Sequence, residues 1–66
     1  MEEVKKLKVL VKHWREHNTE HTGTYDGWAE KMLHMGNKDA YRVLKEIGAR
    51  SREINNCFDD LEKVLS

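Results

Sequence analysis

Three histidines recur at every fourth position in the segment HWREHNTEH, and this histidine ladder is the part of the sequence best suited to chemistry. On a helix, residues four apart lie one turn apart on the same side. Two imidazoles at that spacing can hold one transition-metal ion, and Zn²⁺, Ni²⁺ and Co²⁺ all accept nitrogen ligands. The sequence therefore makes His13, His17 and His21 candidate metal ligands.

The same segment reads H-x-x-E-H twice, a string shared with inverzincin metalloproteases. Those enzymes also need a further ligand, a substrate cleft and a body much larger than 66 residues. The Glu-x-x-His motif of di-iron helical bundles is absent, and no glycine-rich phosphate loop is present. A thiolate–imidazole pair of Cys57 with His17 would lack an oxyanion hole. We therefore expect a protein that is not an enzyme.

Apolar residues at alternating steps of three and four predict a long helix that carries the ladder, from about Glu3 to His34. The stripe has the spacing of heptad a and d positions. Its members are Val4, Leu7, Val11, Trp14, Asn18, His21, Tyr25, Trp28, Met32 and Met35. At this spacing, the aromatic residues are expected to be core residues and not a ligand-binding box.

The segment Gly23–Gly27 is the weak part of this first helix. Each glycine costs a helix about 1 kcal/mol relative to alanine, and Thr24 or Asp26 could cap a new helix. The apolar stripe nevertheless continues in register, and the chain contains no proline. We expect one helix that is continuous or kinked near Gly23–Gly27, with a break into two helices as the alternative.

A turn at Met35–Asp39 should end the first helix, with Gly36 in the left-handed position and Asn37 capping the next helix. The second helix should run from about Lys38 to Val64. Its stripe is Ala40, Leu44, Ile47, Ser51, Ile54, Phe58, Leu61 and Leu65. So short a turn makes the two helices antiparallel. The predicted fold is an all-α, antiparallel two-helix hairpin that forms a single domain over residues 1–66.

Folding the chain at this turn brings the basic N-terminal stretch against the acidic C-terminal one and predicts facing residues. The predicted pairs are Leu10 with Val64, Ala29 with Gly48, and His17 with Cys57. Two helices cannot cover one another's stripes, so the expected assembly is a homodimer that makes a four-helix bundle.

The pairing also extends the candidate metal site, because Cys57 would face His17 with Glu53 and Asp60 a turn to either side. Two interpretations remain open. In one, these side chains join the histidines around Zn²⁺, Ni²⁺ or Co²⁺. In the other, His17 and His21 belong to an ordinary polar interface layer with Asn18, Ser51 or Asn55, and Cys57 is a small buried hydrophobe. Asn18 at an a position would then set the register of the bundle.

Charge and composition limit the partners. Lys plus Arg and Asp plus Glu both number 12, so nothing favours nucleic acid or an anionic membrane. No apolar run approaches a transmembrane helix, and no signal-peptide core follows Met1. The single cysteine cannot form an intrachain disulfide. We expect a cytoplasmic protein.

The pattern HWxEHNxEH, followed by Trp28-Ala29-Glu30-Lys31 and a second amphipathic helix, resembles a group of small prokaryotic helical proteins and domains. The resemblance covers residues 7 to 65. It implies a helical fold and marks the first motif as a family signature, but it brings no activity. Two hypotheses follow: a homodimeric structural module that also docks another protein, and a transition-metal-binding protein that uses the ladder.

Overall fold

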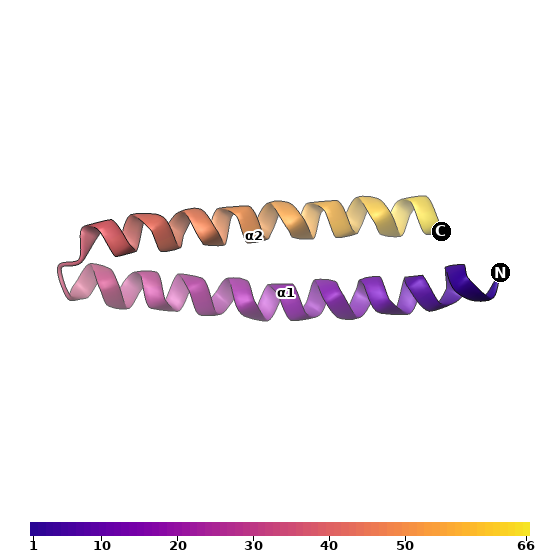
Figure 1. Cartoon of the computed structure of the whole chain (residues 1–66), viewed down its shortest axis with the longest axis horizontal. Coiled ribbons are helices and arrows are strands. Elements are labelled where there is room, and N and C mark those ends of the chain that lie inside the picture. Colours follow the sequence, from indigo (N-terminus) through magenta and orange to yellow (C-terminus); the bar gives the residue numbers. More distant parts are fainter.

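The chain folds as two long antiparallel helices that lie side by side along their whole common length (Figure 1). In the computed structural model, which describes residues 1–66, α1 spans Glu2–His34 and α2 spans Lys38–Leu65. The Cα atoms fill a slab of 53 × 14 × 11 Å. The start of α1 extends beyond the end of α2 (Figure 1). The predicted hairpin and both helix boundaries are confirmed, and neither helix is long and apolar enough to cross a bilayer.

Helix α1 continues without a break through its glycine-containing segment. A Cβ atom built on Gly23 or Gly27 would meet nothing within 4 Å, so neither glycine is needed for a close contact. The Thr22 and Thr24 hydroxyls donate to the carbonyl oxygens of Asn18 and Glu20, at 2.8 and 3.2 Å. These bonds pair the hydroxyls with the backbone of the same helix. The predicted continuity of α1 is confirmed.

The turn has the capping geometry that the sequence predicts. Gly36 has a φ of 80°, which glycine adopts without strain. The Gly36 amide donates to the Leu33 carbonyl at 3.1 Å, and the Asn37 amide donates to the Met32 carbonyl at 2.9 Å, as in a Schellman motif. The Asn37 side chain then accepts from the Ala40 amide at 3.1 Å and caps α2. The end of α1 and the start of α2 are therefore both determined by residues in the turn itself.

The interface between the helices is thin and mostly made of small residues. Only five of the 66 residues are buried, and Val11 is the only large side chain among them. The buried residues are Val11, Thr22, Ala29, Gly48 and Ser51. Ala29 and Gly48 were predicted to face each other, and both are indeed buried. Leu10 and Val64 remain 45% and 80% exposed, so that predicted apolar pair is not buried.

The stripe predicted to be core is turned partly toward solvent. Trp14 and Trp28 are 41% and 49% exposed, and His21 is exposed although it was expected at the centre of the buried stripe. The buried residues of α1 are Val11, which belongs to the stripe, and Thr22 and Ala29, which lie next to it. Part of the stripe stays exposed because α2 covers only one side of it. The uncovered side becomes a surface of the hairpin.

Candidate functional site

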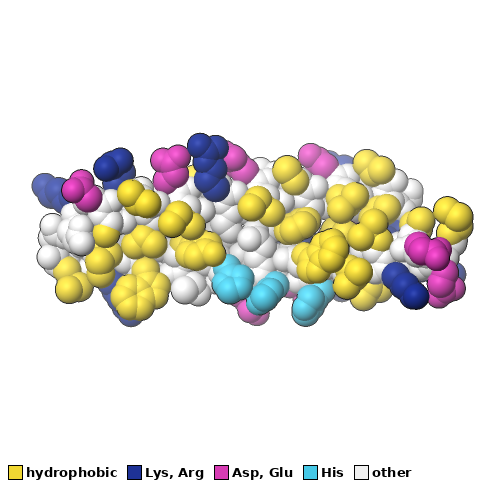
Figure 2. Space-filling view, viewed as in Figure 1, with side chains coloured by type: hydrophobic (Ala, Val, Ile, Leu, Met, Phe, Trp, Pro, Cys, Tyr) yellow, Lys and Arg dark blue, Asp and Glu magenta, His cyan; other side chains and the backbone are white.

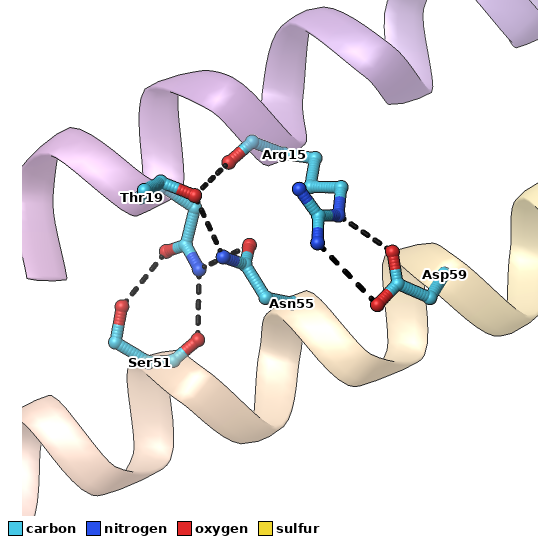
Figure 3. A network of polar contacts seen from close by, with 6 residues as sticks. Arg15, Thr19, Ser51, Asn55 and Asp59 are labelled. Carbon is cyan, nitrogen blue, oxygen red and sulfur yellow. Dashed lines mark hydrogen bonds and ion pairs between the residues drawn. The ribbon is translucent and has the colours of Figure 1, made fainter.

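A polar network joins the middle of the two helices (Figure 3). The Asn18 amide donates to the Ser51 carbonyl oxygen at 2.8 Å and to the Asn55 side-chain oxygen at 2.9 Å. The Ser51 hydroxyl donates to the Asn18 side-chain oxygen at 3.0 Å and lies 2.5 Å from the Thr22 hydroxyl. The Asn55 amide donates to Thr19 at 2.8 Å. Each polar group in this layer finds a partner, as groups away from water require.

This network sets the register of the hairpin. A slip of α2 by one residue would take Ser51 and Asn55 away from Asn18 and leave polar groups unpaired. The register role expected of Asn18 thus has its partners in place. Thr19 and Thr22 were missed as members of the layer. Their spacing in the sequence could have identified them, since both lie within a turn of Asn18 on the side that faces α2.

Two ion pairs flank the polar network. The Arg15 guanidinium donates to the Asp59 carboxylate at 2.5 and 3.5 Å, so the basic N-terminal stretch meets the acidic C-terminal one as predicted (Figure 3). Hydrogen bonding to Asp59, with its charge, raises the pKa of Arg15. On the other side, Arg52 pairs with Asp26, which sequence reasoning missed.

Asp26 lies tightly against α2. Its Oδ1 atom is buried without a hydrogen-bond partner, and a Cβ atom on Gly48 would lie 2.8 Å from it. Gly48 therefore leaves room for a carboxylate between the helices. This is the one glycine in a helix that a neighbouring side chain requires.

A broad apolar face runs over both helices on one side of the hairpin (Figure 2). Its exposed members are between 41% and 50% accessible to solvent. By their helical spacing these are Leu10, Trp14, Trp28, Val43, Ile47 and Ile54, and the half-buried Leu7, Tyr25, Met32, Leu44, Phe58 and Leu61 belong to the same stripes. The Trp14 and Phe58 rings join the two helices, with centroids 6.4 Å apart. Isolated apolar residues are common on surfaces, but a continuous face of this length is a candidate binding surface.

The face contains a shallow hollow between the helices, lined by Tyr25, Val43, Ile47 and Ile54 with polar residues at its margin. A second hollow lies near the open end of the hairpin and is lined only by polar and charged side chains, among them Arg15 and Asp59. Both signs of charge are present there. The aromatic residues expected in the core therefore line a surface as well as an interior.

The histidine ladder runs along one edge of the apolar face, near the middle of the hairpin (Figure 2). The ring centroids of His13 and His17 are 6.2 Å apart, and those of His17 and His21 are 4.5 Å apart. The His21 ring in turn lies 6.3 Å from the Tyr25 ring. All three histidines are exposed, and the polar network between the helices is made without them. Their ring nitrogens thus have no partner in the hairpin.

A single hairpin does not gather the predicted metal ligands. No group of three or more His, Cys, Asp or Glu side chains is placed to hold one ion. Cys57 and Asp60 are exposed, and Glu53 pairs with Arg50 at 3.6 Å. Cys57 is also not the buried small residue that the alternative interpretation expected. The polar layer of that interpretation exists, but it uses Asn18, Ser51 and Asn55 and not the histidines.

Comparison with known proteins identifies a family for most of the chain. Residues 7–65 match a family model described as "Domain of unknown function (DUF8180)". The resemblance found in the sequence was expected over the same residues. No curated protein and no solved structure matches the chain.

Proposed function

The chain belongs to the DUF8180 family, which brings no activity with it, and we propose that it is a non-enzymatic protein-interaction module that works as a homodimer. Two hairpins pack apolar face against apolar face and form a four-helix bundle. The observation that carries the proposal is the apolar face itself, in which two tryptophans are 41% and 49% exposed. Burying such a surface is the main favourable term in association.

The size of the face suits a stable dimer. The whole side of the hairpin that carries the face has Cα extents of 53 and 14 Å, an outline of about 700 Å², which is comparable with the roughly 800 Å² that each partner contributes to a standard interface. The hairpin alone buries only five of its 66 residues. Chains of this size have little core of their own, and association is a common way to supply one.

A second copy of this chain is the favoured partner for the apolar face, because the stripes of two α1 helices match each other when the helices run antiparallel. When two α1 helices pack in opposite directions, Leu7 can face the partner's Met32 and Trp14 can face the partner's Tyr25. Apolar residues of one end thus meet apolar residues of the other end, as a and d positions do in antiparallel helix pairs.

The polar residues of the stripe support the same arrangement. This pairing has its midpoint between Thr19 and Glu20, where Asn18 faces the partner's His21. The only polar members of the α1 stripe therefore lie at the same level in the two copies, while Asn18 keeps its hydrogen bonds to Ser51 and Asn55 within its own hairpin. Any other alignment by whole heptads places one of them against a large apolar residue.

Helix α2 has the same symmetry about the same level of the hairpin. With a midpoint between Arg52 and Glu53, Leu44 faces the partner's Leu61 and Ile47 faces the partner's Phe58. This midpoint lies between Ser51 and Asn55, which both bond to Asn18 beside the midpoint of α1. One two-fold axis across the hairpin thus serves both helices, and Ser51, which lies at the level of the partner's Ile54, is buried against α1.

Sedimentation equilibrium at micromolar concentration tests the proposal. The wild-type protein is expected to be a dimer, and Ile54→Lys, which places a charge on the apolar face, is expected to be a monomer. Val9→Lys is the matched control, because Val9 is 71% exposed on the opposite side of α1. It should leave the dimer intact. A monomeric wild-type chain would refute the homodimer.

Spin labels test the antiparallel arrangement. With Cys57→Ser in the background, Lys38→Cys places one label at the turn of each hairpin. Antiparallel hairpins put the two labels about 45 Å apart, from a rise of 1.5 Å per residue. Parallel hairpins would put them about 10 Å apart plus the reach of the labels. The short distance would overturn the proposed symmetry.

Transition-metal binding by the histidine ladder is a second candidate function. The observation that favours it is the 4.5 Å separation of the His17 and His21 rings, together with their exposure. Two imidazoles leave a metal ion half coordinated, because zinc sites take four ligands.

A further inference from the structure

We infer that the antiparallel dimer completes a binding site for one divalent transition-metal ion, with His17 and His21 of each copy as its four ligands. The inference rests on the proposed homodimer. It explains why two exposed imidazoles lie at the edge of an apolar face, where no hydrogen bond within the hairpin uses their nitrogens.

The position of the pair along the helix is what brings the two copies together. His17 and His21 lie on either side of the α1 midpoint between Thr19 and Glu20. A two-fold axis at that level therefore places residues near the midpoint of one α1 beside residues near the midpoint of the partner's α1. With a rise of 1.5 Å per residue, His21 and the partner's His17 lie about 1.5 Å apart along the bundle, and all four histidines fall within about 8 Å.

The position across the bundle agrees. A two-fold axis that runs across the helices stacks each α1 on the partner's α1. The ladder follows one edge of the apolar face (Figure 2), and this edge would therefore lie on the edge that carries the partner's ladder. His21 is in the a/d stripe and His17 is beside it, so both side chains border the interface. His13 lies a turn further from the midpoint and is too distant from the partner's pair to join the site.

The donor set selects the class of ion. Four neutral imidazole nitrogens in a tetrahedral arrangement suit Zn²⁺ and Co²⁺, and Ni²⁺ also binds imidazole well. Ca²⁺ and Mg²⁺ prefer oxygen ligands and are not expected to bind. Cys57, Glu53 and Asp60, which a single chain was expected to contribute, have no place in this site. Two histidines from each of two copies replace them.

Isothermal titration of the untagged, metal-free protein with Zn²⁺ tests the site, alongside sedimentation with and without the ion. We expect one Zn²⁺ per two chains. Co²⁺ should bind with the same stoichiometry and give the intense visible absorption of a tetrahedral complex. His17→Ala and His21→Ala should each weaken binding at least about a hundredfold. His13→Ala is the matched control and should bind as the wild type does.

The outcomes separate the two proposals. A dimer that binds no Zn²⁺ tighter than micromolar overturns the metal site and leaves the homodimer standing. One Zn²⁺ per chain on a monomer overturns both. A chain that is monomeric without metal and dimeric with half an equivalent of Zn²⁺ supports the site and overturns the metal-free dimer. Tight binding that survives in His17→Ala or His21→Ala refutes the assigned ligands, and circular dichroism of each variant checks that the helices are retained.

Discussion

Replacing the two glycines in the middle of α1 by alanine should stabilise the protein. Gly23 and Gly27 are both inside a continuous helix, and a Cβ atom at either position meets nothing within 4 Å. Both lie on the side of α1 away from α2 and from the apolar face. Alanine therefore adds no clash and disturbs no interface. It removes only the extra backbone freedom that glycine loses on folding.

The expected magnitude follows from helix propensity. Each substitution should raise the free energy of unfolding by about 1 kcal/mol, and the double variant by about 2 kcal/mol. For a domain of this size, each kcal/mol corresponds to a rise in Tm of about 4–8 °C. Thermal unfolding followed by circular dichroism at 222 nm measures the change. Protein concentration must be equal in all samples, because the Tm of a dimer depends on it.

Gly48→Ala is the internal contrast. The added Cβ atom would lie 2.8 Å from the Asp26 Oδ1 atom and 3.3 Å from an Arg52 nitrogen, so the carboxylate must move. The propensity gain should be cancelled or reversed there. It should return in the Asp26→Ala background, where the obstructing group is gone. A loss of stability in Gly23→Ala or Gly27→Ala would refute the reasoning, because it would mean that these glycines are not helical in solution.

Substitutions at three further positions test the polar network and the turn. Asn18→Ala should lower the free energy of unfolding by about 1–3 kcal/mol, because Ser51 and Asn55 lose a shared partner. Urea unfolding measures this loss, and an unchanged midpoint would contradict the role of the network. Asn37→Ala should cost about 1 kcal/mol through loss of the N-cap, seen as a lower Tm. Gly36→Ala should cost about 1 kcal/mol because φ is 80° there, and Gly36→Asn, which tolerates that conformation better, should cost less.

Arg15 offers a prediction about pH. Its pKa is raised by Asp59, so the stability linked to Arg15 is present below its unfolded-state pKa and is lost only as the pH rises through the folded-state value. That window lies in strongly alkaline solution. Protonation of Arg15 should therefore contribute no pH dependence near neutrality, and comparing Arg15→Gln with the wild type by thermal unfolding at pH 7 and pH 9 checks this. A difference between the two proteins that changes over this range would contradict it.

Much of the fold could be predicted because it is local. The step of three and four residues predicts the helices, and the left-handed Gly36 followed by Asn37 ends one helix and starts the next. A turn of so few residues leaves no arrangement but the antiparallel one. The pairing of Arg15 with Asp59 and the burial of Ala29 and Gly48 follow from where the turn lies.

Which side of each helix is buried was decided only by tertiary packing. The a/d stripe is wide enough to serve two neighbours, and periodicity alone does not say which part the first neighbour covers. In the hairpin, α2 covers Val11, Thr22 and Ala29, and His21 and Trp28 are left on the surface. The sequence alone thus determined that the histidines form a ladder with metal-binding spacing. The packing of α2 against the small and polar side of α1 decided that the ladder borders an open apolar face, because small residues let the helices approach closely and turn their large side chains outward.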